Sequence, residues 1–433
     1  MSGFPGSLFK KWNAEFGTQF AVPFCFSDNQ TAFRQWSVKF DLYRQQKQRL
    51  IEQFNKALRQ IEISDSAKQR LEQQKAAAEN QLAEVESLLT GFNFIKSQHE
   101  IHLSLQQRIA STQHFDSYFK NIFRDWVWGD VENQVYKNIL QNSKTSTGQA
   151  LIIGGGAGRL AYDLASLRSS LQVLQLDINP LLSVVAEKIC RGGSFDLTEI
   201  AGFTYDLNSI SKKHKLGLPG ESIDRNRLSF VVGDITDNPL VDNSFDCVIC
   251  PWLIDIISED FSTFSQRLNF CLKRGGELLI FGPLSFENQK PQHKHSHQEL
   301  EAILIESGFE INSKDFIETE YLHSPFDPQT RIEKIIVLRA TAVKAAKKPK
   351  AVAHFPSWLI NKDETVKPEP SLINLQAQKN LEAQFLATVL SGKTINQMIE
   401  MLANSSAGYN KQQAEDFILS VFARLVETKE IEF

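Results

Sequence analysis

The residues best suited to hold a cofactor lie around a glycine-rich turn at residues 154–158. An apolar run beginning at Leu151 precedes the turn, and after it apolar residues recur every three to four positions from Leu160 to Leu167. This pattern predicts a strand, a tight turn and a helix. Glycine lets the backbone take positive φ or lie against a ligand, and the start of a helix offers free N–H groups. The stretch therefore predicts a cradle for a nucleotide or cofactor.

Two acidic residues close the apolar runs that follow the turn. Asp177 closes the first, about twenty residues on, where a carboxylate accepts hydrogen bonds from ribose hydroxyl groups. Asp234 closes the next, and two further apolar runs begin near Phe245 and Lys273. A dinucleotide-binding fold requires a second mononucleotide-binding half with its own helices, and the sequence does not continue in that way.

The order of these elements resembles a class I S-adenosylmethionine (SAM)-dependent methyltransferase. The resemblance implies an α/β, Rossmann-like sheet and SAM as cofactor, with Asp177 at the ribose, Asp234 near the adenine amine and the glycine turn beside the methionine moiety. The cofactor-binding residues that it implies in this part of the chain are Gly154, Gly156, Gly158, Asp177, Asp234, Ile235 and Cys247. A dehydrogenase and an inactive cofactor fold are the alternatives.

The stretch before the glycine turn resembles the carnosine N-methyltransferase family, whose helix at this place carries an Arg-Asp-Trp-Ser motif. This chain keeps the motif at residues 124–126, followed by Gly129 and Glu132, and departs from it at Val127. The resemblance implies that Asn121 and Arg124 contact SAM. A guanidinium group suits the methionine carboxylate because it forms two parallel hydrogen bonds. The alternative is an Arg–Asp pair that ties two helices together.

Further matches to this family extend through most of residues 115–340. Ile254-Asp255 matches a Phe-Ile-Asp motif, and residues 281–287 match a Gly-Pro-Leu-Leu-Tyr-His motif. We predict that Asp255 accepts the N–H of an imidazole acceptor; the alternative is that Asp255 caps the next helix. Glu287 stands where the family has histidine, and residues 331–336 replace its tyrosines. The acceptor pocket, with Asp255 and Glu287 as predicted catalytic residues, is therefore expected to be rebuilt.

The resemblance implies methyl transfer from SAM to an imidazole or histidine-type nitrogen of a small molecule or peptide. One alternative is a methyltransferase that acts on a protein or peptide histidine docked by the C-terminal part of the chain. A second alternative is a non-catalytic scaffold with the same fold.

Length and composition indicate several domains. With 433 residues, the chain is longer than one ordinary domain. We expect an aromatic segment and helical hairpin at residues 1–110, a methyltransferase domain at 111–340, a Pro/Lys-rich linker at 341–371 and a mostly helical, winged-helix-like domain at 372–433. The hairpin should break near residues 64–66, where Ser and Asp are natural N-caps. The C-terminal domain is expected to have helices at 381–390, 394–402 and 411–427 and a strand at 430–433.

Charge and cysteine content limit the partners. The formal net charge of −4 makes nucleic acid an unlikely partner, so the C-terminal domain is expected to serve a protein partner or a homodimer. Five scattered cysteines and an N-terminus without signal-peptide character predict a cytoplasmic location, and the lack of a long apolar run predicts no membrane contact. No metal is expected, because Cys247 and Cys250 lie in a strand and the alternating histidines at 293–297 lie in a polar loop.

Overall fold

The computed structural model describes residues 5–12, 22–26, 29–60, 62–90, 115, 118–257, 259–286, 291–328, 330–349, 392–405, 408–415 and 417–418. The chain divides into two compact units. The first comprises Met1–Asn29, Gln46–Phe92 and Tyr118–Ala351, and the second comprises Gln30–Gln45, Asn93–Ser117 and Val352–Phe433. The glycine turn and the residues around it belong to the first unit.

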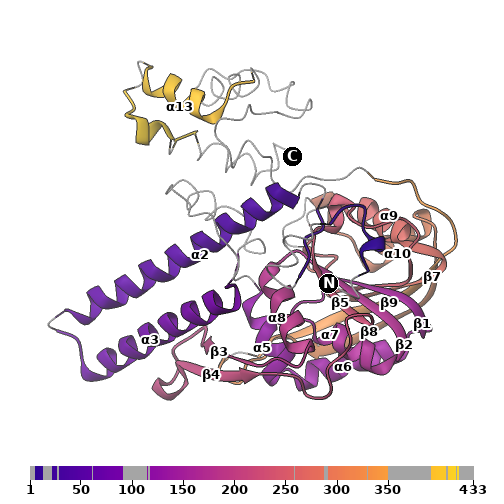
Figure 1. Cartoon of the computed structure of the whole chain (residues 1–433), viewed down its shortest axis with the longest axis horizontal. Helices are drawn as coiled ribbons and strands as arrows, with labels where there is room; N and C mark the ends of the chain where they lie inside the picture. The colour runs from indigo at the N-terminus through magenta and orange to yellow at the C-terminus, as the bar shows by residue number, and fades with distance from the viewer. Residues whose placement is uncertain are drawn as a thin grey trace. The chain divides into compact units, whose positions relative to one another are not determined.

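A seven-stranded sheet in the order β5-β2-β1-β6-β7-β9-β8 forms the centre of the first unit (Figure 1). Its strands are β1 (Thr147–Ile153), β2 (Ser170–Asp177), β5 (Leu228–Val232), β6 (Phe245–Pro251), β7 (Leu272–Gly282), β8 (Phe309–Glu320) and β9 (Ile332–Ala342). The first five strands of this order are parallel, and β9 pairs antiparallel with both β7 and β8. Parallel strands are covered on both faces, which explains why their sequences read as continuous apolar runs. The predicted Rossmann-like α/β fold is confirmed.

Helices from the segments before and between the strands pack on this sheet. They are α6 (Asp130–Gln141), α7 (Arg159–Leu167), α8 (Pro180–Cys190), α9 (Phe261–Cys271) and α10 (His297–Glu306). Helix α7 contacts β2, α8 contacts β5, α9 contacts β7 and α10 contacts β8. Within β7, Gly275 takes a φ of 81°.

The glycine turn has the left-handed backbone that the sequence predicted. Gly154, Gly156 and Gly158 have φ values of 72°, 67° and 97°. A Cβ on Gly158 would lie 2.5 Å from the Cβ of Ala186 on α8. The absence of a side chain at Gly158 therefore lets the start of α7 lie against α8.

An antiparallel hairpin is inserted between α8 and β5. Its strands are β3 (Phe195–Ile200) and β4 (Ser211–Leu216), which form a separate two-stranded sheet. Helix α3 (Asp65–Leu88) packs on β3.

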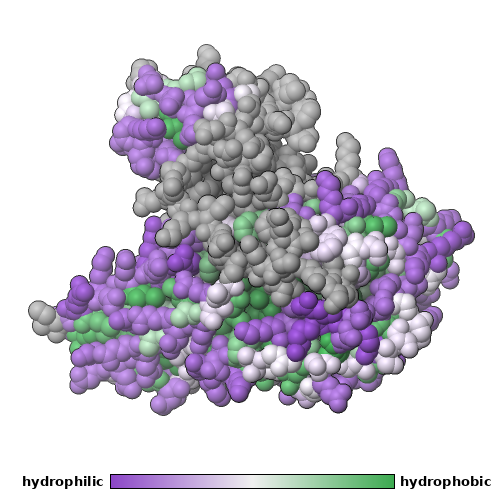
Figure 2. Space-filling view, in the orientation of Figure 1, coloured by the Kyte–Doolittle hydropathy of each residue, from purple (hydrophilic) through white to green (hydrophobic). Residues whose placement is uncertain are grey.

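The N-terminal helices are α2 (Asn29–Leu58) and α3. The predicted break is confirmed, because Ser64 caps α3 by accepting a hydrogen bond from the N–H of Ala67. Near the turn between the helices, Figure 2 shows hydrophobic residues gathered where they meet and hydrophilic residues over most of the surrounding surface. This distribution is typical of amphipathic helices.

In the C-terminal part, the predicted helix at 394–402 corresponds to α13 (Ile395–Ala403), which Thr394 and Gln397 begin with a capping box. The predicted helix at 381–390 and strand at 430–433 lie outside the described residues, so the winged-helix-like domain and its role in binding a partner stay predictions. Strand β9 extends to Ala342, two residues beyond the predicted boundary at 340. Within the described ranges, none of the helices has the length and apolar character needed to cross a membrane.

Replacing Gly158 by alanine should destabilise the protein, because the new Cβ would meet Ala186 and the residue would keep a positive φ. We expect the free energy of unfolding in urea to fall by about 2–5 kcal/mol. Gly275→Ala is the matched control, since Gly275 also has positive φ but its Cβ would meet nothing within 4 Å. Equal losses in the two variants would show that the contact with α8 contributes nothing.

Candidate functional site

Polar side chains from the segment before α6 border the glycine turn. A Cβ built on Gly156 would lie 3.5 Å from Nη2 of Arg124, 3.6 Å from Oδ2 of Asp125 and 3.7 Å from Nδ2 of Asn121. The structure therefore brings Asn121 and Arg124 to the turn, and their contacts with SAM stay predictions. Asn121 belongs to α5 (Phe119–Phe123), and Arg124 begins the π-helical turn Arg124–Trp128.

The π-helical turn depends on the glycine that follows it. The N–H of Gly129 donates to the carbonyl of Arg124 at 3.1 Å, and a Cβ on Gly129 would lie only 2.2 Å from that carbonyl oxygen. Asn133 donates a second hydrogen bond to the same carbonyl from its Nδ2 at 3.1 Å. A glycine at 129 is thus required for this geometry, and π-helical turns are frequent at functional sites.

Arg124 is a buried cation between two carboxylates. Its Nε donates to Oδ1 of Asp125 at 2.7 Å, and its Nη1 lies 3.7 Å from Oε2 of Glu132. Burial alone would lower the pKa of Arg124, but the charges of Asp125 and Glu132 raise it overall, so the guanidinium group stays charged. It also lies 5.6 Å from the ring centre of Tyr136. The site therefore contains a fixed, desolvated positive charge.

The alternative for Arg124 was an Arg–Asp pair that ties two helices together, and Asp125 makes such a connection. Its Oδ2 accepts a hydrogen bond from the N–H of Arg159 at the start of α7, and its carbonyl accepts one from Nη1 of Arg159 at 3.1 Å. Asp125 thus ties the π-helical turn to α7. The Nη2 of Arg124 still faces Gly156, so the pairing does not exclude a contact of Arg124 with a ligand.

Asp177 ends β2 next to the glycine turn. Its Oδ2 accepts a hydrogen bond from the N–H of Gly156 at 3.2 Å, and its Oδ1 accepts one from the N–H of Asn179 at 2.9 Å. Burial raises the pKa of Asp177 to about 7, although these hydrogen bonds oppose the rise. A carboxylate held by backbone N–H groups beside a glycine turn suits the hydroxyl groups of a ribose.

Asp234 lies beside Asp177 because β5 is the neighbour of β2. The N–H of Gly233 donates to the carbonyl of Asp177 at 2.9 Å. Oδ1 of Asp234 accepts the N–H of Thr236 at 2.8 Å and begins a short 3-10 turn that contains the buried Ile235. Asp177, Asp234 and Ile235 therefore meet at the carboxyl edge of the sheet. Their contacts with SAM stay predictions.

Cys247 is not brought to this edge. It pairs with Ala150 in β1, four residues before the glycine turn begins, and with Glu277 in β7. Its thiol is buried near Ser143 and Thr145, which precede β1, and burial raises its pKa. Four residues of strand span about 13 Å, so the predicted contact of Cys247 with the cofactor has no support in its position.

Asp255 lies just beyond the carboxyl end of β6. Burial raises its pKa to about 6, while a hydrogen bond from the N–H of Ser285 opposes the rise. The motif segments that contain Asp255 and Ser285 therefore converge. The alternative that Asp255 caps the next helix is wrong, because Asp260 caps α9 by accepting the N–H of Ser262. Glu287 lies outside the described residues.

Aromatic residues to which the sequence assigned no role stand beside Asp255. Trp252 and Tyr321 stack with ring centres 4.1 Å apart and an interplanar angle of 19°, and Trp252 has a φ of 49°. Burial raises the pKa of Tyr118, and the charges of Asp177 and Asp255 raise it further. Tyr118 is thus near both the predicted ribose carboxylate and the predicted acceptor carboxylate. The only feature of the sequence that could have pointed to Tyr118 is its position directly before α5, which carries Asn121.

The segment predicted to rebuild the acceptor pocket reaches the same space. Arg331 forms an ion pair with Glu333, and its guanidinium carbon lies 5.1 Å from the ring centre of Tyr321. Both charges act on Asp255: Glu333 raises its pKa and Arg331 lowers it. Charged and aromatic side chains thus gather near Asp255.

The alternating histidines at 293–297 have acidic side chains as neighbours. His293 and His295 lie 3.7 Å and 3.2 Å from Oδ1 of Asp260, and His297 lies 3.4 Å from Glu301. In the part of the chain that the structure describes, no group of three or more His, Cys, Asp or Glu residues is arranged to hold a metal ion.

The residues present fit a polar cofactor. Oδ1 of Asn121 is a buried acceptor for which the described residues provide no hydrogen-bond partner, and it lies in the side chain that borders Gly156. A buried acceptor of this kind is costly unless a ligand or water satisfies it.

Part of this fold matches a known protein family. The family model described as "Methyltransferase domain" matches residues 151–280, from β1 through most of β7. No curated protein sequence matches the chain.

Solved structures with a similar fold include a SAM-dependent methyltransferase from Methanosarcina mazei, at 18% identity over 47% of this chain and 97% of that chain, with a TM-score of 0.35. They also include phosphoethanolamine N-methyltransferase 2 from Haemonchus contortus in complex with S-adenosyl-L-methionine, at 17% identity over 58% of this chain and 62% of that chain, with a TM-score of 0.35.

The family match coincides with the glycine turn and with the strands that end in Asp177 and Asp234. The protein therefore contains a class I methyltransferase domain and is a SAM-dependent methyltransferase, with S-adenosylmethionine as its cofactor.

Replacing Asp177 by asparagine should change the pH dependence of stability in the ligand-free protein. The raised pKa means that the contribution of Asp177 to stability is fully present below about pH 4 and is lost as the pH rises through about 7. The variant should therefore gain stability relative to the parent between about pH 5 and pH 8, measured by urea unfolding. It should also bind SAM more weakly, because an amide N–H can meet a ribose hydroxyl where the carboxylate only accepts. Parallel stability curves for variant and parent would contradict the raised pKa.

Replacing Arg124 by lysine should weaken SAM binding although the charge is kept. A lysine cannot reproduce the planar fork that pairs with Asp125 while facing Gly156. We expect calorimetry to give a dissociation constant for SAM about tenfold higher or more, consistent with loss of a charged hydrogen bond. If lysine supports the same affinity, Arg124 has only a structural role.

Proposed function

We propose that the protein transfers the methyl group of SAM to an imidazole or histidine-type nitrogen of a small molecule or peptide, as in the carnosine N-methyltransferase family. The observation that carries this proposal is a buried carboxylate, Asp255, next to the cofactor side of the site, with a pKa raised to about 6 by burial. Such a group is mostly ionised at pH 7, so it can accept a hydrogen bond from an acceptor N–H.

SAM supplies an electrophilic methyl group when it is bound. The chain's own residues hold and orient the two reactants. Asn121, Arg124, Asp177 and Asp234 surround the cofactor side, where buried and pre-positioned groups lower the entropic cost of bringing the reactants together.

Asp255 decides which ring nitrogen of the acceptor reacts. A neutral imidazole has a lone pair on one nitrogen and an N–H on the other, and its usual pKa near 6.5 leaves it largely unprotonated at pH 7. By accepting the N–H, the carboxylate of Asp255 turns the lone pair of the other nitrogen toward the methyl donor. It also stabilises the positive charge that develops on the ring, and it can take the N–H proton once the nitrogen is methylated.

The aromatic side chains near Asp255 favour a flat methyl acceptor. Trp252 and Tyr321 stack on each other beside Asp255, and Tyr118 lies near both carboxylates of the site. The left-handed φ of Trp252 is unfavourable for a bulky residue, and such strain is concentrated at ligand-binding sites. These features support an aromatic ring as the methylated group.

Replacing Asp255 by asparagine should lower turnover while SAM affinity stays nearly unchanged. The amide can place an N–H where an acceptor N–H arrives, so the productive tautomer is no longer favoured. We expect turnover of carnosine (β-alanyl-histidine) with labelled SAM to fall about ten- to a hundredfold, which corresponds to about 1.5–3 kcal/mol. Asp260→Asn is the control, because it makes the same change at a nearby carboxylate that caps α9 and contacts His293 and His295. Turnover within about twofold of the parent would reject the orienting role of Asp255.

The pH profile provides a second readout on the same variant. Since both Asp255 and the imidazole must be unprotonated, log kcat/KM in the parent should fall with a limiting slope of about two below their pKa values. In Asp255→Asn the slope should be about one, because only the acceptor then titrates.

A further inference from the structure

Glu199 on β3 is a buried carboxylate that joins three separate segments. Its two oxygens each lie 3.2 Å from Nε1 of Trp128, and its Oε1 accepts a hydrogen bond from Oγ of Ser324 at 2.6 Å. Its Oε2 lies 2.9 Å from Nε2 of His214 on β4. Trp128 ends the π-helical turn that begins with Arg124, and Ser324 lies three residues after Tyr321. One carboxylate thus contacts both the turn that carries Arg124 and the segment that follows Tyr321.

Packing alone does not account for a charge at this position. Glu199 is 4% exposed, and His214 lies between Phe123 and Phe326, with ring centres 5.5 Å and 5.9 Å away. Removing a carboxylate from water is costly, and apolar replacements of buried ionic groups are often neutral or stabilising. What the carboxylate of Glu199 provides beyond packing is therefore a pair of acceptor oxygens that fix the direction of the hydrogen bonds from its neighbours.

Neighbouring contacts hold the segment around Ser324 to the same side of the site. The N–H of His323 donates to Oε1 of Glu132 at 3.4 Å, and Asp327 pairs with Lys120 of α5. Glu132 is also the partner of Arg124. The segment that follows Tyr321 is thus fixed to the residues that surround Arg124.

Helix α3 holds β3 from the opposite side. The N–H and Oγ1 of Thr198 donate to Glu84 at 2.6 Å and 3.0 Å, and the carbonyl of Thr198 accepts a hydrogen bond from Gln81 at 2.9 Å. Because Thr198 and Glu199 are consecutive, their side chains point to opposite faces of the strand. The backbone next to Glu199 is therefore fixed by α3.

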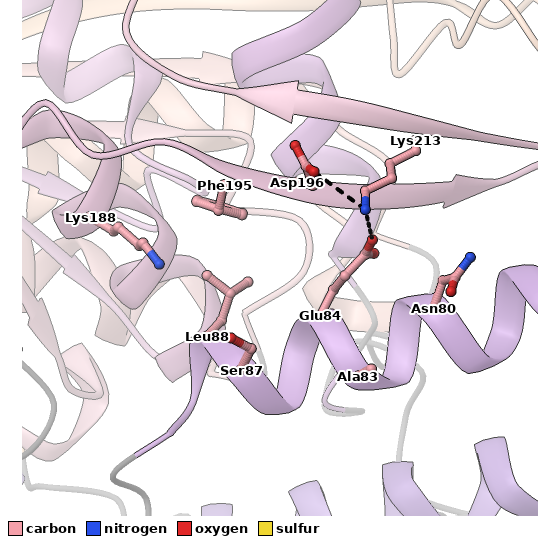
Figure 3. A pocket seen from close by; sticks show the side chains of 9 residues that line it. All are labelled: Asn80, Ala83, Glu84, Ser87, Leu88, Lys188, Phe195, Asp196 and Lys213. Carbon is pink, nitrogen blue, oxygen red and sulfur yellow. Dashed lines mark ion pairs between the residues drawn. The ribbon is translucent and has the colours of Figure 1, made fainter.

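A groove of about 340 Å³ lies along this contact between α3 and the β3–β4 hairpin. Figure 3 shows Lys213 reaching between Asp196 and Glu84, at 3.3 Å and 3.7 Å. The ammonium group of Lys188 lies 5.3 Å from the ring centre of Phe195. Two lysines and two carboxylates line the groove, so its charges balance, and we interpret it as the seam by which α3 holds the hairpin.

We propose that Glu199 is a positioning residue for methyl transfer: through Trp128 it sets the position of Arg124, and through Ser324 it sets that of Tyr321. The link through Trp128 to Arg124 is the cofactor half and concerns the SAM site. The link through Ser324 to Tyr321 is the acceptor half and rests on the proposed function. The effects of the two links can be measured separately.

The first experiment measures SAM affinity by calorimetry in Glu199→Gln. Glutamine keeps the shape but places an N–H among three donors, so Trp128 loses its fixed partner. We expect the dissociation constant of SAM to rise about tenfold.

Glu277→Gln is the matched control. Glu277 is 7% exposed and accepts hydrogen bonds from Ser143, Lys144 and Thr145 at the amino end of the sheet. It should lose stability while its SAM affinity stays within about twofold of the parent. If Glu199→Gln behaves in the same way, Glu199 is merely structural and the proposal is wrong.

The second experiment separates the two halves. Trp128→Phe should weaken SAM binding, whereas Ser324→Ala should leave SAM affinity unchanged, raise KM for carnosine and speed hydrogen exchange in residues 321–328. Ser324→Thr, which restores a hydroxyl group, should recover the parent values. Unchanged exchange in Ser324→Ala would overturn the acceptor half. If the parent does not methylate carnosine, the proposed function fails, while the SAM affinities and the exchange rates still decide the role of Glu199.

Discussion

The cofactor side of this protein depends on the close approach of backbone segments where side chains are missing. Gly156 leaves the space that Asn121 and Arg124 border, Gly158 lets α7 lie against α8, and Gly129 lets an amide reach the carbonyl of Arg124. A Cβ at Gly158 or Gly129 would meet neighbouring atoms at 2.5 Å or less. These glycines allow a charged side chain and a carboxylate to be placed inside the protein next to a helix start.

Burial away from water changes the pKa values of these charged groups and strengthens their interactions. Burial raises the pKa of Asp177 and of Asp255, while backbone N–H groups hold both carboxylates in place. Arg124 remains charged because Asp125 and Glu132 lie beside it. In an environment of low dielectric constant, such groups interact strongly with a polar ligand and need little reorganisation when it arrives. The same burial lowers the stability of the ligand-free protein, as is common at functional sites.

The inserted hairpin connects regions that the sequence separates widely. Strand β3 contacts α3 through Thr198, and through Glu199 it contacts the π-helical turn and the segment after Tyr321. Glu199 thus lies outside the central sheet and contacts both the turn that begins with Arg124 and the segment after Tyr321.

The sequence by itself predicted the parallel strands of the central sheet and the acidic residues that follow them. Apolar runs and glycine spacing are local signals, and the carboxyl ends of parallel strands meet at one edge, so the order of the strands along the chain was enough to place Asp177, Asp234 and Asp255 together. Tertiary structure alone decided the stack of Trp252 on Tyr321, the buried contacts of Glu199 and the remoteness of Cys247 from the glycine turn. Each of these depends on strand register or on contacts between distant segments, which local patterns do not encode.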